Sequence, residues 1–127
     1  MKLFKMAALA VILCLPFSLF SQDFVGDWTM EVVTSAGDKI PAKLSIQDGG
    51  SYTVDFGMDG NVEIHGNYEL DGDQMTVWDK EGGEGCPSGA KGVYRYSIEG
   101  KEMTMERISD ECETRSGPEG KMVFSRM

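Results

Sequence analysis

The sequence contains few residues whose side chains and spacing are typical of a catalytic site. The chain has one histidine, His65, and three cysteines, Cys14, Cys86 and Cys112. Nucleophilic catalysis by serine or cysteine needs a nearby base, and His65 lies on the polar face of an expected strand without an evident partner. Paired carboxylates occur only in expected loops, which would hold their geometry poorly. We therefore expect no enzymatic activity.

The amino-terminal segment has the pattern of an export signal. Two lysines precede a mostly apolar run over residues 6–20, which is too short to span a bilayer as a helix. This predicts a cleaved signal peptide over residues 1–21 and a mature domain over residues 22–127, periplasmic or extracellular and without a membrane span. A lipoprotein anchored through Cys14 is the alternative, although Leu13 stands where a small residue is expected.

Cys86 and Cys112 are the cysteines of the expected mature chain. Two cysteines in an exported domain of this size indicate a disulfide, because the compartment is oxidising. A zinc site is the competing interpretation, but it would need more Cys or His residues than His65 alone. A bond across this separation would stabilise the domain by about 3.5 kcal/mol in the chain-entropy model.

Charge and glycine content exclude several classes of protein. Two of the 12 basic residues lie in the expected signal, so the mature chain has 10 basic and 21 acidic side chains, a net charge of −11. Surfaces that bind nucleic acid are basic, so we expect no nucleic-acid partner. The 16 glycines disfavour a helical bundle, because glycine destabilises helices.

Apolar and polar residues alternate with period two in successive segments, which is typical of half-buried strands. The eight segments are Trp28–Val32, Ile40–Ile46, Tyr52–Phe56, Val62–Leu70, Met75–Val77, Tyr94–Ile98, Met103–Met105 and Met122–Phe124. Short connections such as Asp71-Gly72 and Glu99-Gly100 suit tight hairpins. We predict an all-β fold, an eight-stranded up-and-down antiparallel barrel; a two-sheet sandwich is the alternative.

Alternate connections of such a meander lie at the same end of the barrel. The connections near 35–39, 59–60, 80–90 and 109–120 share one end, which we name the mouth. The tight connections near 47–50, 71–72 and 99–101 share the other end, which we name the floor. Both long loops and both mature cysteines therefore fall at the mouth.

The inward positions carry methionine and aromatic side chains that could bind a ligand. Methionine adapts to the shape of a ligand, and tyrosine hydroxyls can orient it, so an eight-stranded interior can hold one small molecule. A filled core made of the same residues is the alternative. At the rim, an arginine could receive a ligand carboxylate or pair with a nearby acid. The candidate ligand-binding residues are Met30, Tyr52, Phe56, Tyr68, Tyr94, Tyr96, Met103, Met105 and Arg107.

Acidic residues gather in the segments assigned to the mouth. They are Asp79, Glu81, Glu84, Asp110, Glu111, Glu113 and Glu119, against Lys80 and Arg115. We expect solvated loops here, with no metal and no cofactor; calcium binding is the alternative, although no EF-hand spacing is present. Such a rim would admit cationic or neutral apolar molecules more readily than anions.

The segment Phe24-Val25-Gly26-Asp27-Trp28 resembles the Gly-x-Trp signature of lipocalins. In that family the tryptophan closes the barrel floor beneath a basic side chain from the end of the last strand. The resemblance therefore implies structural roles for Gly26 and Trp28. It also implies one for Arg126, which shares the inward parity of Phe124.

The usual lipocalin is longer and carries a helix, so the sequence is more similar to short bacterial lipocalin-like domains, which are often exported. Residues 92–96 and 110–115 look like the carboxy-terminal half of such domains, in which a cysteine pair links the mouth loops. We predict an exported lipocalin-like barrel that binds a small, largely apolar ligand without catalysis. The alternative is a module with a filled core whose mouth loops bind a protein partner.

Overall fold

The computed structural model describes residues 24–34, 36–81 and 86–127. The expected signal peptide, with Cys14, lies outside the described residues. The elements are β1 (Gly26–Val33), β2 (Lys39–Gln47), β3 (Ser51–Phe56), β4 (Ile64–Asp71), β5 (Gln74–Glu81), β6 (Lys91–Glu99), β7 (Glu102–Asp110), the short 3₁₀ turn η2 (Glu113–Arg115) and β8 (Lys121–Arg126).

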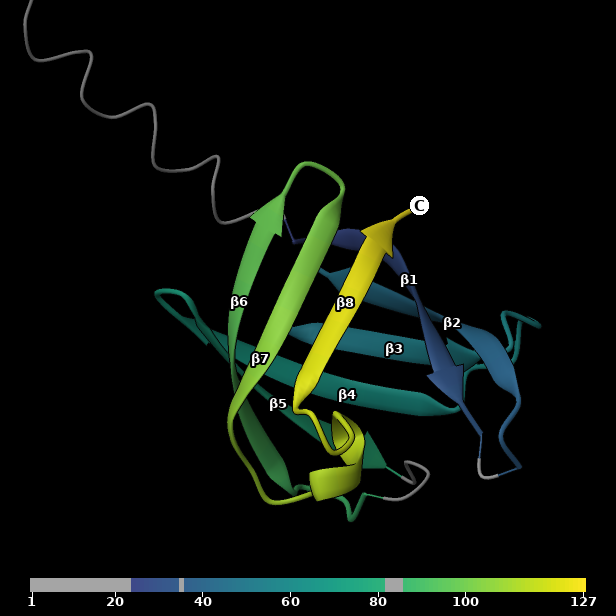
Figure 1. The fold of residues 1–127 in the computed structure, drawn as a ribbon. Coiled ribbons are helices and arrows are strands. Elements are labelled where there is room, and N and C mark those ends of the chain that lie inside the picture. The colour runs from purple at the N-terminus through teal and green to yellow at the C-terminus, as the bar shows by residue number, and fades with distance from the viewer. Residues whose placement is uncertain (1–23, 35, 82–85) are drawn as a thin grey trace, which may run out of the picture.

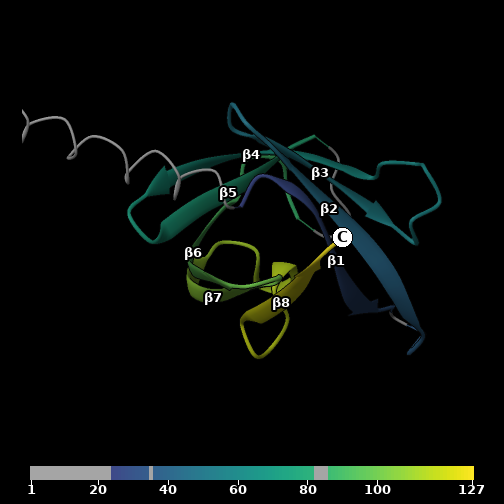
Figure 2. The same ribbon diagram turned by 90° about the horizontal axis from the view of Figure 1, so that it is seen from above.

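The eight strands form a closed antiparallel barrel in which each strand pairs with its neighbours in the sequence and β8 returns to β1. This confirms the predicted fold class and the up-and-down topology. The β6–β7 hairpin and the carboxy terminus lie at the floor, at the top of Figure 1, and η2 lies at the mouth, at the bottom. Figure 2 shows the ring of strands from above.

The hairpins at the floor follow the turn chemistry of the sequence. Gly72 and Gly100 each open a two-residue connection and have φ angles of +64° and +59°, which glycine adopts without steric cost. Because the turns are short, they set the register, pairing Asp71 with Gln74 and Glu99 with Glu102. The tight connections predicted for this end are confirmed.

The ring is joined unevenly. β1 pairs with β2 along its whole length, but it pairs with β8 only through Trp28 with Arg126 and Thr29 with Ser125. The two strands meet at the floor and diverge toward the mouth (Figure 1). The barrel wall is therefore held most loosely along the β1–β8 seam.

Two bulges interrupt the regular pairing near the mouth. Gly66 pairs with Asp79 while its neighbour His65 pairs with Glu81, so one residue of β5 is left between them. In the same way, the β6–β7 register shifts between Val93 and Tyr94, and β7 gains an extra residue at Ile108. A bulge reverses which residues face inward beyond it.

Candidate functional site

The barrel encloses a cavity of about 890 Å³ that extends to the mouth loops. This volume is within the range of small-molecule sites, about 300–1,000 Å³. Its wall is mostly apolar and comes mainly from β1 to β5. Residues that line it include Met30, Val32, Ile40, Ala42, Leu44, Ile46, Tyr52, Val54, Phe56, Ile64, Tyr68, Met75, Val77, Met105, Met122 and Phe124, together with the charged Glu63, Asp79 and Arg115.

The structure brings five of the nine candidate ligand-binding residues to this cavity. These are Met30, Tyr52, Phe56, Tyr68 and Met105. The other four do not line it. Met103 and Tyr94 are completely buried in the packed part of the core. The Tyr96 ring packs near Phe24 at the floor, and Arg107 bonds to the 111–120 connection.

Tyr52 spans the cavity wall to reach a buried carboxylate. Its hydroxyl donates a hydrogen bond to Asp79 Oδ1 at 3.0 Å. Gly66 lies between the two residues in the sheet, pairing with Tyr52 on β3 and with Asp79 on β5. The Tyr52 ring can cross Gly66 only because glycine has no side chain: a Cβ there would lie 2.3 Å from the ring. Burial, reinforced by the Asp79 carboxylate, raises the pKa of Tyr52 far above its usual value. Tyr52 is therefore a neutral donor at physiological pH.

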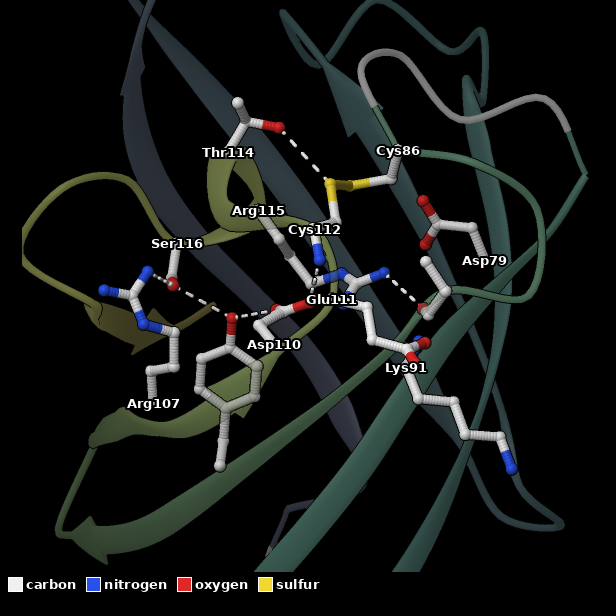
Figure 3. Close-up of polar contacts among 12 residues, drawn as sticks. Asp79, Cys86, Lys91, Arg107, Asp110, Glu111, Cys112, Thr114, Arg115 and Ser116 are labelled. Carbon is white, nitrogen blue, oxygen red and sulfur yellow. Dashed lines mark hydrogen bonds and ion pairs between the residues drawn. A yellow bond between two sulfur atoms is a disulfide. The ribbon is translucent and has the colours of Figure 1, made fainter.

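A second polar cluster joins β6 to the mouth loops (Figure 3). Tyr94 donates a hydrogen bond to Asp110 Oδ2, while Asp110 Oδ1 accepts the Cys112 amide at 2.8 Å and pairs with Arg115 Nη1 at 2.6 Å. Arg115 Nη2 also donates to the Ala90 carbonyl at 2.8 Å. The charge of Asp110 is thus neutralised inside the protein.

Tyr94 is also linked to the 111–120 connection. The Ser116 hydroxyl lies 2.9 Å from Tyr94 Oη, and Arg107 Nη1 donates to Ser116 Oγ at 3.3 Å and to the Gly117 carbonyl at 3.1 Å. Burial and the bond to Asp110 raise the pKa of Tyr94 to about 12. Arg107 therefore holds a mouth loop in place, rather than facing the cavity or pairing with an acid.

Two of the acids expected in solvated mouth loops are buried instead, and the expectation was wrong for them. Asp79 is 3% exposed, and the Asp110 side chain is fully buried. Asp79 continues the inward parity of Met75 and Val77, a signal that was present in the sequence. Asp110 faces inward because the bulge at Ile108 reverses the parity set by Met105, and nothing local in the sequence marks that bulge.

The predicted disulfide is confirmed: Cys86 and Cys112 are bonded, with 5.6 Å between their Cα atoms. Cys86 lines the cavity, and the Thr114 hydroxyl lies 3.3 Å from Cys112 Sγ (Figure 3). The bond joins the β5–β6 connection to the segment before η2. It therefore fixes two of the loops that border the cavity opening.

The floor has the arrangement that the Gly-x-Trp segment predicted. The Arg126 guanidinium stacks over the fully buried Trp28 ring, 4.2 Å from its centroid. Gly26 has a φ of +134°, and a Cβ there would lie 2.9 Å from Arg126 Nη1, so the glycine leaves room for the arginine. Trp28 Nε1 donates to the Phe24 carbonyl at 2.9 Å, and Phe24 packs edge-on against Tyr68. The floor is closed by these contacts.

A separate group of carboxylates at the end of β3 and in the β3–β4 connection was not identified from the sequence. Asp55, Asp59 and Glu63 bring oxygen atoms within 4.8 Å of one another. Asp55 accepts the amides of Asp59 and Gly60, and Glu63 accepts the Phe56 amide. Hydrogen bonding from the Asn61 amide lowers the pKa of Asp59. These bonds account for the cluster as loop structure.

Comparisons of the chain with protein-family models, with curated proteins and with solved structures each found no match. Across residues 24–34, 36–81 and 86–127, no helix has the length and apolar character needed to cross a membrane.

Proposed function

We propose that this protein is an exported, lipocalin-like barrel that binds a small, largely apolar molecule in its cavity, which extends to the mouth, without catalysis. The observation that carries the proposal is the cavity of about 890 Å³ with a mostly apolar wall. When an apolar ligand displaces water from the cavity, apolar wall surface is removed from water, and this lowers the free energy of the complex. A few tyrosine and carboxylate groups at one end would orient such a ligand.

The floor supports the lipocalin-like part of the proposal. Gly26, Trp28 and Arg126 stand in the relation that the family signature implies, with the arginine over the indole. The Cys86–Cys112 bond supports export, because disulfides persist in oxidising compartments.

The residues with catalytic potential either lie away from the cavity or are already bonded to other groups of the protein. His65 is exposed on β4, and both mature cysteines are joined in the disulfide. The acids at the cavity, Asp79 and Glu63, each bond to a group of the protein itself. These placements support binding rather than reaction.

The alternative of a filled module with a protein partner is less well supported. A filled interior is present around Trp28, Tyr94 and Met103, which are completely buried. The part of the interior lined mainly by β1 to β5 contains the cavity and is not filled.

Uptake of a neutral lipophilic fluorophore, N-phenylnaphthylamine, by the folded mature chain tests the proposal. We expect saturable binding at one site per chain, with displacement by n-decanol. Leu44→Trp, which places an indole in the cavity wall, should abolish uptake, with Ala42→Leu as a milder second variant. Val123→Trp on the exposed face of β8 is the matched control and should bind normally. The proposal fails if the wild-type chain shows no saturable uptake, or if the cavity variants bind as the wild type does.

A further inference from the structure

Asp79 is a buried carboxylate at the mouth end of the cavity. Its residue is 3% exposed, and within the part of the chain that the structure describes its carboxylate accepts one side-chain hydrogen bond, from Tyr52. Among the described residues, no cationic side chain forms an ion pair with it. A buried charge is costly unless it is paired, so this carboxylate is suited to a cationic partner.

Asp110 shows how this protein neutralises a buried carboxylate when the partner is internal. It is fully buried, pairs with Arg115 at 2.6 Å, and accepts bonds from Tyr94 and the Cys112 amide. Arg115 is committed to this cluster by its second bond to Ala90. In Figure 3 no dashed line joins the Asp79 carboxylate to the bonded network around Asp110.

Among the residues that the structure describes, the charged side chains that line the cavity are Glu63, Asp79 and Arg115, and the arginine is paired with Asp110. Within that part of the chain, the two carboxylates at the cavity, Glu63 and Asp79, have no ion-pair partner, and most of the other lining side chains are apolar. Tyr52 holds one oxygen of Asp79 and leaves the other as an acceptor.

We propose that the ligand of this cavity is an amphiphilic amine, whose alkyl or aromatic part lies among the apolar wall residues and whose ammonium group pairs with Asp79. This inference rests on the proposed binding function and names its ligand class. An ammonium group supplies the charge and the N–H donors that the free oxygen accepts. A single carboxylate in an apolar wall suits an ammonium better than a calcium ion, which takes six to eight oxygen ligands.

The test compares n-decylamine with n-decanol, which share a chain and differ in charge at neutral pH. Each is titrated against the folded mature chain by calorimetry and by displacement of N-phenylnaphthylamine. We expect the amine to bind at least about tenfold more tightly than the alcohol, because hydrogen bonds between charged groups are stronger than those that a neutral hydroxyl forms. Sodium decanoate should bind more weakly than the alcohol.

Asp79→Asn is the decisive variant, because an asparagine oxygen can still accept the Tyr52 bond. It should remove the preference for the amine while leaving the affinity for decanol unchanged. Glu119→Gln, at an exposed position in the 111–120 connection, makes the same change in net charge and should keep the preference. If Asp79→Asn does not fold, raising the ionic strength on the wild type gives a second measure: a pair inside the cavity is screened less than one at the surface.

The outcomes separate this inference from the proposed function. Equal binding of amine and alcohol, a preference that survives Asp79→Asn, or a preference that disappears in moderate salt overturns the amine assignment alone. Absence of binding by all three decyl compounds and by the fluorophore overturns the proposed function as well. An amine preference that Asp79→Asn removes and Glu119→Gln retains supports both.

Discussion

The floor and the mouth of this barrel are held together by different interactions. At the floor, Phe24, Trp28 and Arg126 close the barrel by aromatic packing and one buried hydrogen bond. At the mouth, buried carboxylates bond to tyrosines, and a disulfide joins the loops. Apolar side chains stabilise the fold simply by being buried, whereas each buried polar group also needs a hydrogen-bond partner. The floor is therefore held by packing, and the mouth by polar bonds and a disulfide beside the groups that the proposed ligand would meet.

The largest expected effect is at the floor. Trp28→Ala should lower the free energy of unfolding by about 3–5 kcal/mol, because it removes a fully buried indole from packed surroundings. Leu44→Ala in the cavity wall should cost less, about 1–2 kcal/mol, because Leu44 is only partly buried and faces open space. Urea unfolding measures both. Equal losses would contradict the distinction between a fully packed position and one that faces the cavity.

Removal of the disulfide tests the mouth. Replacing both Cys86 and Cys112 by serine should lower the free energy of unfolding by about 3.5 kcal/mol, because the 26-residue loop is no longer closed in the unfolded chain. The two loops that it joins should also exchange amide hydrogens faster than the floor does. Hydrogen exchange followed by mass spectrometry measures both regions in one experiment. If exchange became faster to the same extent throughout the barrel, the disulfide would not act locally on the mouth loops.

Alkaline pH should lower the free energy of unfolding of the barrel, with the buried tyrosines of the mouth among the groups responsible. The folded-state pKa of Tyr94 is about 12, against an ordinary value of 10.0, and that of Tyr52 is also raised. Above pH 10 the unfolded chain loses these protons while the folded chain keeps them, so stability is present below pH 10 and falls as the pH rises. Tyr94 alone should account for a loss of about 2 kcal/mol by pH 12.

Unfolding free energies measured between neutral pH and pH 12 give the check on this prediction. Tyr52→Phe and Tyr94→Phe should each flatten the decline, since phenylalanine has no proton to lose. A decline that is the same in both variants as in the wild type would show that other groups cause it.

The smallest expected effect is at the floor surface. Arg126→Gln should cost about 0.5–2 kcal/mol, because the guanidinium no longer stacks on Trp28. Arg95→Gln, which removes an exposed ion pair with Asp73 on the outer face, is the matched control and should cost less than about 1 kcal/mol. Thermal unfolding of the two variants measures the difference. An equal loss of stability in both would show that the Arg126 side chain does not stabilise the floor.

The cavity was only partly predictable from the sequence. Inward parity identified Met30, Tyr52 and Phe56 as interior residues, and they line the cavity. It identified Met103 equally well as interior, but the sequence has no signal that distinguishes a packed position from one beside open space. That distinction depends on how side-chain volumes from distant strands fill the barrel.

The sequence by itself determined the strands, the ends of the barrel, the disulfide and the closure of the floor. Period-two alternation and turn residues are local, and they fix which loops share an end. Only the tertiary structure decided that the interior is open along β1 to β5, that Asp110 turns inward beyond a bulge, and that Asp79 has no internal cation among the described residues. These properties depend on register and packing between strands far apart in the chain, which no local pattern encodes.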